Sequence, residues 1–305
     1  MESGLERRSS HAERGCSGSG PLPRRPYGKG VSLSIIGLGG MALAGMSRDH
    51  ANRLVAHAIA RGVNYFDVAP SYGDGSAEEM LGAALGSHRD TVFLASKTLK
   101  RSAEDARLDL EQSLRRLRRG HIDLFQFHAV NKAEDVRRIL APDGAAEAVL
   151  RARDQGLVRF LGFSSHSVPV ALTLLDLFAF DSILFPVNFV CYARGNFGPQ
   201  VVEKARARGV TCLAIKSLSW SPWRPGELRK YPNCWYRPLE DPAMARLALR
   251  FTLSEEICAL LPPGDERLVR MALDLAEDFQ PITVQERQEL FEKARGMKPI
   301  MTAKK

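Results

Sequence analysis

The sequence lacks paired cysteines and lacks any long apolar run. Its 305 residues include five cysteines, which lie far apart and form no CxxC pair. This spacing argues against a disulfide scaffold or a zinc ribbon, so we expect reduced thiols, a cytoplasmic location and no metal site. No stretch is long and apolar enough to span a bilayer, so we expect no membrane partner.

Acidic residues are fewer than basic ones, and the formal net charge is +8. A basic surface attracts polyanions, which raises the possibility of a nucleic-acid partner. Many of the basic residues, however, lie in the opening segment or in Arg115–Arg119, where a predicted helix ends and cations favour its dipole. We therefore expect no nucleic-acid partner, and such a role would require both basic regions to act together.

The opening segment, residues 1–29, is rich in Gly, Ser, Pro and Arg and has no apolar core of the kind that secretion signals carry. We expect a flexible N-terminal tail over 1–29, one barrel domain over 30–297 and a short C-terminal tail over 298–305.

From Val31 onward, apolar β-type runs alternate with amphipathic helical segments. A repeat of roughly thirty residues is typical of βα units, because parallel strands need a crossover of that size. About eight such units favour an α/β fold, a single closed (β/α)8 TIM barrel, over an open doubly wound sheet. The predicted strands are 34–40, 64–68, 91–97, 122–128, 160–163, 182–188, 210–215 and a last one within 255–261. The predicted helices are 49–61, 77–85, 102–117, 143–155, 169–178, 199–208, 239–251 and 267–278.

Ionisable side chains stand at the ends of three successive predicted strands. Asp67, Lys97 and His128 lie at or just past the second, third and fourth strands, and Tyr72 follows Asp67 by five residues in the next loop. In a barrel of this kind the chemistry sits at the C-terminal strand ends, so these groups are expected to point into one mouth.

Together the four groups suit the reduction of a carbonyl. A phenol, with a reference pKa near 10, protonates a developing alkoxide only where a cation such as Lys97 stabilises the phenolate. Asp67 would hold that ammonium in place, and His128 would hydrogen-bond the substrate oxygen. Taken singly, each residue could also have a purely structural role, as a cap, a packing group or a solvated strand end. Their order on successive βα units favours the interpretation that all four belong to one catalytic site.

The order of a strand-end Asp, a Tyr-Gly pair, a Ser-Lys pair and a His resembles that of the aldo-keto reductase superfamily. In this sequence it is met by Asp67, Tyr72-Gly73, Ser96-Lys97 and His128. The resemblance runs from about residue 37 to about residue 209. It implies a TIM barrel, an NADPH-type cofactor across its C-terminal mouth, reversible reduction of aldehydes or ketones, and a catalytic tetrad of Asp67, Tyr72, Lys97 and His128.

The resemblance also implies cofactor contacts. Ser164 and Ser165 match a family segment beside the nicotinamide carboxamide, with Ser165 in place of the usual Asn, and Asn188 falls near a strand-end Asn-Gln. Lys216 stands where many relatives have Ser after an aromatic, so it is read either as a pyrophosphate contact or as a strand-end lysine in water.

Three residues nearer the N-terminus complete the expected cofactor set: Gly40, Met41 and Asp67. Met41 is also expected to form an apolar wall of the substrate pocket.

The expected cofactor is NADPH or NADH. Relatives that prefer NADPH usually follow a Pro-Gly turn with basic residues, whereas Gly264 is followed here by Asp265 and Glu266. Such acids repel a 2′-phosphate and favour NADH, but Arg267 and Arg270 lie close enough in sequence to reverse that preference.

The segment 217–237, after the seventh predicted strand, is aromatic and basic. We read it either as a lining for an anionic or aromatic substrate or as a self-packed Ω-like loop.

The sequence thus predicts an NAD(P)H-dependent reductase of a small-molecule carbonyl substrate, with Tyr72 as general acid. The alternative is a catalytically weak cofactor-binding sensor or regulatory subunit. Substrate identity, direction of reaction and oligomeric state stay open.

Overall fold

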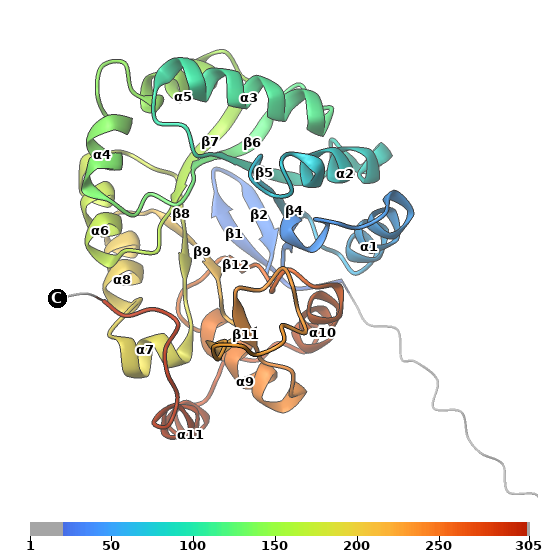
Figure 1. Ribbon diagram of the computed structural model, residues 1–305, viewed down its shortest axis with the longest axis vertical. Helices are drawn as coiled ribbons and strands as arrows, with labels where there is room; N and C mark the ends of the chain where they lie inside the picture. Colours follow the sequence, from blue (N-terminus) through green and yellow to red (C-terminus); the bar gives the residue numbers. More distant parts are fainter. Residues whose placement is uncertain (1–20, 304–305) are drawn as a thin grey trace, which may run out of the picture.

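The structure, a computed structural model, describes residues 21–303, and eight parallel strands form its main sheet (Figure 1). A parallel bridge between Ile36 and Leu260 joins the two edges of this sheet, so the sheet closes and the expected single (β/α)8 barrel is confirmed. In spatial order the strands are β3 (Leu38–Gly39), β4 (Tyr65–Asp67), β5 (Phe93–Thr98), β6 (Ile122–Phe127), β7 (Val158–Ser164), β8 (Ser182–Pro186), β9 (Thr211–Ile215) and β12 (Ala259–Leu260).

Helices surround the strands on all sides (Figure 1). They are α1 (Arg48–Ala60), α2 (Ser76–Ala84), α3 (Ala103–Leu117), α4 (Ala133–Ile139), α5 (Ala145–Asp154), α6 (Val168–Leu177), α7 (Phe189–Gly195), α8 (Pro199–Ala207), α9 (Pro242–Leu253), α10 (Glu266–Ala276) and α11 (Val284–Ala294). Between residues 21 and 303, none of them combines the length and the apolar character needed to cross a membrane.

Two hydrophobic cores follow from the period of two along each strand. Side chains such as Phe66 and Leu94 face outward and pack under the helices, whereas Tyr65, Phe93 and Leu124 face inward and fill the barrel. Because alternate residues share a face, the inward positions of these strands continue to their C-terminal ends. That alternation decides which polar side chains enter the mouth.

The N-terminal end of the barrel is closed by an antiparallel hairpin of β1 (Arg24–Gly28) and β2 (Val31–Ser34). Tyr27 is buried against the inner core and donates a hydrogen bond to Ser182 Oγ at 2.8 Å. The expectation of a flexible tail over 1–29 is therefore wrong for residues 24–28, because composition does not reveal a pairing partner. Residues 1–20 lie outside the described part.

Several boundaries also differ from expectation. The run 34–40 is divided between β2 and the short strand β3, and the run 255–261 contributes only β12. The sequence did not indicate α4, α7, α11 or the hairpin of β10 (Ser219–Pro222) and β11 (Tyr236–Pro238). The expected C-terminal tail packs against α7 as far as Ala303, whose N–H donates to Gly195 O at 2.9 Å, while residues 304–305 are outside the described range.

The loop that carries Tyr72 leads directly into α2, which is held tightly against its neighbours. Buried Glu78 accepts hydrogen bonds from Ser96 Oγ of β5 at 2.8 Å and from Arg116 Nη1 of α3 at 3.2 Å. A Cβ atom on Gly82 would lie 2.4 Å from Arg116 O, so α2 and α3 approach more closely than any side chain allows.

We expect Gly82→Ala to lower the free energy of unfolding by about 1–3 kcal/mol, because the new methyl overlaps backbone atoms of α3. Gly120→Ala is the matched control, since a Cβ there meets nothing within 4 Å. Chemical denaturation of both variants measures the effect, and equal stabilities would contradict the close helix approach.

Candidate active site

The inward face of three neighbouring strands brings the predicted residues together. Asp67 on β4 follows inward-facing Tyr65, and Lys97 on β5 follows inward-facing Phe93 and Ala95. His128 comes directly after β6, and its N–H donates to Thr98 O of β5 at 2.8 Å. The period of two therefore directs Asp67 and Lys97 into the barrel mouth.

Lys97 is the centre of the group. Its ammonium donates hydrogen bonds to Asp67 Oδ1, to Val68 O at 2.9 Å and to the Tyr72 hydroxyl at 3.5 Å. The side chains of Lys97 and Asp67 are 0% and 1% exposed, so this is a buried ion pair. All three donor positions of the ammonium are thus directed at acceptors of the site.

The second carboxylate oxygen of Asp67 is also held. Gln126 Nε2 donates to it at 3.0 Å, and the Tyr65 hydroxyl donates at 3.2 Å. Sequence reasoning missed Gln126 and Tyr65, although each lies two residues before a predicted site residue and shares its inward face. The carboxylate has donors on both oxygens, as a buried charge requires.

The pKa values follow from burial and charge. Burial raises the pKa of the Tyr72 phenol, and the neighbouring Lys97 ammonium offsets part of that rise. Burial by itself disfavours the ammonium of Lys97, but the adjacent Asp67 carboxylate outweighs it and holds the pKa of Lys97 above its usual value. Tyr72 is therefore protonated and Lys97 is charged at neutral pH.

His128 packs its ring edge-on against Tyr72, with ring centroids 5.8 Å apart. Burial, together with the nearby Lys97 and other cations, holds the pKa of His128 well below its usual value. Its imidazole is neutral at pH 7, so it carries one N–H donor and one acceptor. Its ring thus lies beside the Tyr72 phenol, on the same side of the mouth.

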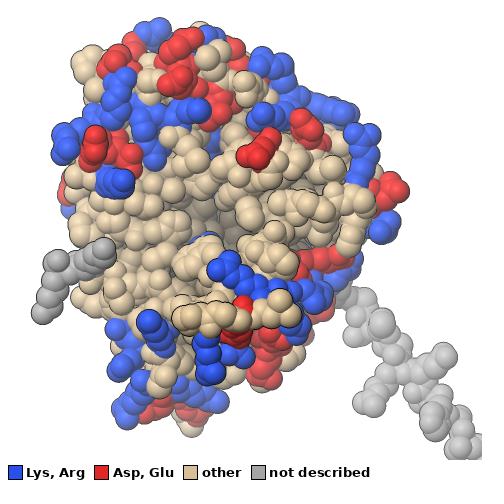
Figure 2. Space-filling view, viewed as in Figure 1, with Lys and Arg blue, Asp and Glu red and all other residues tan. Residues whose placement is uncertain are grey.

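The four residues line a cavity of about 250 Å³ at the C-terminal ends of the strands. Figure 2 shows the face of the molecule on which this cavity opens. The middle of that face is hollowed and mostly free of charged residues, which gather toward the edge of the face. The other lining residues are Gly39, Met41, Ser164, His166, Leu184, Ile215, Lys216, Asn233, Trp235, Tyr236, Leu261, Pro262, Pro263 and Gly264.

The predicted cofactor residues divide into two groups. Met41, Asp67, Ser164 and Lys216 line the cavity, whereas Gly40, Ser165 and Asn188 do not. Gly40 lies against Val68, so close that a Cβ would be 2.6 Å from Val68 Cγ2. Ser165 Oγ donates within its own loop, to Ser167 O at 3.2 Å.

The side chain of Asn188 is fully engaged elsewhere. Its Oδ1 accepts from Val190 N at 2.9 Å and from Cys191 N at 3.1 Å, which caps α7. Its Nδ2 donates to the carbonyls of Lys216, Ser217 and Ser219 at 2.9–3.3 Å. Asn188 therefore anchors the chain that follows β9 and has no free group directed at the mouth.

The segment 217–238, which we call the strap, contains the hairpin of β10 and β11 and lies over the mouth. Asn233 Nδ2 donates to Met41 O at 3.1 Å and to Ala44 O at 3.2 Å, which ties the strap to the loop after β3. Tyr231 and Cys234 pack against Leu268 of α10. The strap is thus both self-packed and pocket-lining. Sequence reasoning did not single out Asn233.

The residues of the mouth fit part of a dinucleotide. The Ser164 hydroxyl, the unpartnered Nε2 of His166 and the ammonium of Lys216 offer hydrogen-bond donors to an amide or a phosphate. A cavity of about 250 Å³ is smaller than ordinary ligand pockets of roughly 300–1,000 Å³, so a whole dinucleotide requires movement of the strap or a path outside the cavity. Within residues 21–303, no cluster of His, Cys, Asp or Glu forms a metal site.

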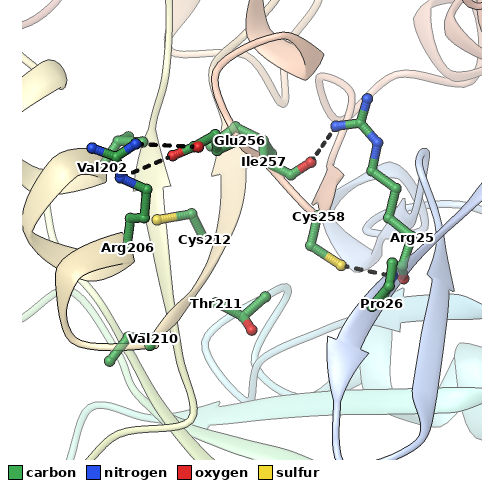
Figure 3. A pocket seen from close by; sticks show the side chains of 11 residues that line it. Arg25, Pro26, Val202, Arg206, Val210, Thr211, Cys212, Glu256, Ile257 and Cys258 are labelled. Atoms are coloured by element: carbon green, nitrogen blue, oxygen red, sulfur yellow. Dashed lines mark hydrogen bonds and ion pairs between the residues drawn. The ribbon is translucent and has the colours of Figure 1, made fainter.

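A second hollow, of about 410 Å³, lies at the N-terminal ends of β9 and β12 (Figure 3). Its charged groups are engaged: Arg206 pairs with Glu256, and Arg25 donates to Leu253 O and Ile257 O. Burial raises the pKa values of the thiols of Cys212 and Cys258 to about 12, which leaves them unreactive at neutral pH. This larger hollow therefore lacks the chemistry found at the mouth.

The ion pair at the mouth predicts a strongly non-additive pair of substitutions. Lys97→Met leaves the Asp67 carboxylate buried without its counter-charge, so we expect a loss of about 3–5 kcal/mol in the free energy of unfolding. Adding Asp67→Asn removes that charge and should recover part of the loss. Chemical denaturation of the single and double variants tests this, and simple additivity would argue against coupling of the pair.

The pKa of His166 predicts a loss of stability in acid. Burial and the nearby Lys216 lower this pKa to about 4, below the unfolded value near 6.5, so the unfolded state binds more protons between these values. Stability should therefore fall as the pH drops from 6.5 to 4. His166→Gln removes this contribution, so denaturation midpoints across that range should depend less steeply on pH in the variant than in the wild type. Parallel profiles would show that His166 titrates normally.

Known proteins resemble this chain over the part that contains Asp67, Tyr72, Lys97 and His128. The profile of the Aldo/keto reductase family matches residues 35–233. Aldo-keto reductase YhdN of Bacillus subtilis is 31% identical over 206 residues, which cover 62% of this chain and 60% of that protein. 6-Dehydroglucose reductase of Novosphingobium aromaticivorans is 30% identical over 236 residues, which cover 68% of this chain and 72% of that protein.

Among solved structures, the holo form of aldo-keto reductase AKR11C1 from Bacillus halodurans superposes with a TM-score of 0.71 at 23% identity, covering 90% of this chain and 96% of that one. This likeness supports the barrel fold. Since the family profile spans more than half of the sequence, and includes Asp67, Tyr72, Lys97 and His128, the chain belongs to the aldo/keto reductase family.

Proposed function

We propose that this protein is an NAD(P)H-dependent reductase of aldehydes or ketones, with Tyr72 as the general acid. The observation that carries the proposal is the Tyr72 hydroxyl, 3.5 Å from a buried lysine that is paired with Asp67, at the wall of a cavity. Membership of the aldo/keto reductase family supports the same reaction class.

The chemistry of the site follows from its charges. A carbonyl oxygen gains negative charge during reduction, and Tyr72 is placed to give it a proton while Lys97 stabilises the resulting phenolate. Asp67 keeps Lys97 charged and oriented, and neutral His128 donates a second hydrogen bond to the same oxygen. The hydride for the carbonyl carbon would come from a reduced nicotinamide when one is bound.

Ser164, with Met41 as an apolar contact, fits such a cofactor, and His166 and Lys216 offer donors that suit an anionic group of either the cofactor or the substrate. Asn188 and Ser165 are engaged in other hydrogen bonds. The alternative function, a sensor that binds the cofactor and turns over poorly, is less favoured, because the family comparison supports an oxidoreductase. A cytoplasmic location and the absence of a nucleic-acid partner stay predictions.

Tyr72→Phe separates these functions. We expect the variant to lose about 10²- to 10⁴-fold in kcat, because a general acid typically contributes that much, while its affinity for the reduced cofactor changes little. The measurement is loss of reduced-nicotinamide absorbance with a panel of aldehydes, quinones and keto acids. Tyr192→Phe is the control, since the Tyr192 hydroxyl on α7 is buried and has no partner among the described residues.

Full activity in Tyr72→Phe would refute the assignment of the acid. Tight cofactor binding by the wild type without turnover of any substrate would instead support the sensor.

The acids after Gly264 are neutralised by their neighbours. Asp265 caps α10 and accepts from Arg267 Nε and Nη2, each at 2.9 Å. Glu266 accepts from His50 and from Arg270 Nε at 2.8 Å. Neither a free carboxylate nor a free guanidinium is left in these pairs, so we propose that the enzyme uses NADPH and NADH with little discrimination.

Arg267→Ala tests this proposal. The substitution frees the Asp265 carboxylate, which then repels a 2′-phosphate, so the Kd of NADPH should rise about two- to fivefold relative to that of NADH. Fluorescence titration with both cofactors measures the ratio. Arg295→Ala, which removes a similar exposed ion pair after α11, is the control. An unchanged ratio of the two Kd values would mean that the adenosine end of the cofactor does not bind beside Asp265.

A further inference from the structure

Lys216 brings a positive charge into the mouth that no carboxylate balances. It lines the cavity, and among residues 21–303 no Asp or Glu lies within ion-pair distance of it. The cavity wall contains a single acid, Asp67, which is already paired with Lys97. Lys97 and Lys216 together thus exceed the available negative charge by one.

The backbone and neighbours of Lys216 hold it in this position. Its φ of 65° lies in the left-handed region, which a residue with a side chain adopts at a cost and which often marks a functional position. Its ammonium lies 5.4 Å from the ring centroid of Trp235 and 5.3 Å from that of Tyr236. Two strap residues therefore orient this cation by cation–π contacts.

His166 lines the same cavity, and its side chain has an unpartnered polar atom. Its backbone N–H donates to Asn131 Oδ1 at 2.6 Å, but its Nε2 is buried without a hydrogen-bond partner within residues 21–303. Burial and the charge of Lys216 lower its pKa to about 4, so the ring is neutral and can present an N–H from Nε2. A buried polar atom of this kind costs free energy unless a ligand satisfies it.

We propose that Lys216 and His166 form an oxyanion subsite that binds the carboxylate of the carbonyl substrate, so that the enzyme prefers aldehydes and ketones bearing a carboxylate over neutral ones. The proposal rests on the reductase function proposed above. It names the substrate class of that same site.

The same subsite chemistry would also suit a phosphate of the cofactor. Position favours the substrate: Lys216 lies close enough to the reacting groups to lower the pKa of His128, and it shares a cavity of about 250 Å³ with Tyr72. A carboxylate held there lies within one small molecule's reach of the proton donor. Comparison of substrate preference with cofactor affinity distinguishes a bound carboxylate from a bound cofactor phosphate.

The test compares isosteric substrates. 3- and 4-carboxybenzaldehyde are matched with 3- and 4-formylbenzamide, which have the same shape but no charge. We expect Lys216→Met to lower the ratio of kcat/KM for acid over amide by roughly tenfold to a hundredfold in at least one matched pair, the effect of losing one charge-assisted hydrogen bond. Lys216→Arg, which keeps the charge, should restore part of that preference. His166→Gln, which keeps a donor, should lower the ratio less than Lys216→Met.

Two binding measurements make the result interpretable. The first is the Kd of the reduced cofactor, measured by fluorescence titration without substrate. If this Kd rises tenfold in Lys216→Met while the acid-to-amide ratio of kcat/KM is unchanged, the proposal is overturned and the subsite belongs to a cofactor phosphate. Calorimetric titration with 4-(hydroxymethyl)benzoate needs no turnover. If the wild type binds this alcohol and Lys216→Met does not, the subsite is supported. Failure to reduce any aldehyde would refute only the reductase function.

Discussion

The mouth of this barrel depends on the buried ion pair of Lys97 and Asp67. Two charges removed from water are costly unless every donor and acceptor is satisfied, and here the carboxylate is held by three donors while the ammonium reaches three acceptors. Because the pair needs residues on three adjacent strands in register, it links the chemistry to correct closure of the sheet. The pKa values of Tyr72 and His128 then follow from burial beside this charge.

The two halves of the mouth are built differently. The half that contains Asp67, Lys97 and His128 stands on strand ends, where packing on both faces leaves side chains little freedom. The other half is made from the strap and the turn before α10. Asn233 ties the strap to the loop after β3, and Tyr231 and Cys234 of the strap pack against Leu268 of α10. A rigid half that is close to the family pattern and a loop-built half that departs from it are consistent with a shared reaction and an individual ligand preference.

Charge balance distinguishes the two halves as well. Lys97 has Asp67 as its counter-charge, whereas Lys216 is surrounded by aromatic rings and neutral imidazoles. Burial without a counter-ion lowers the pKa of Lys216 to about 8, and an anion bound beside the ammonium offsets that cost. The mouth that contains Tyr72 and Lys97 is therefore also electrostatically suited to an acidic ligand.

The sequence by itself determined the βα alternation, the closed barrel and the inward direction of Asp67 and Lys97, because these follow from local periodicity and from the position of each residue at a strand end. Only the tertiary structure decided that residues 24–28 pair in a hairpin, that Asn188 turns away to cap α7, and that Lys216 lacks a carboxylate partner within residues 21–303. These features depend on contacts between segments far apart in the chain, and no local pattern of residues records which distant groups will meet.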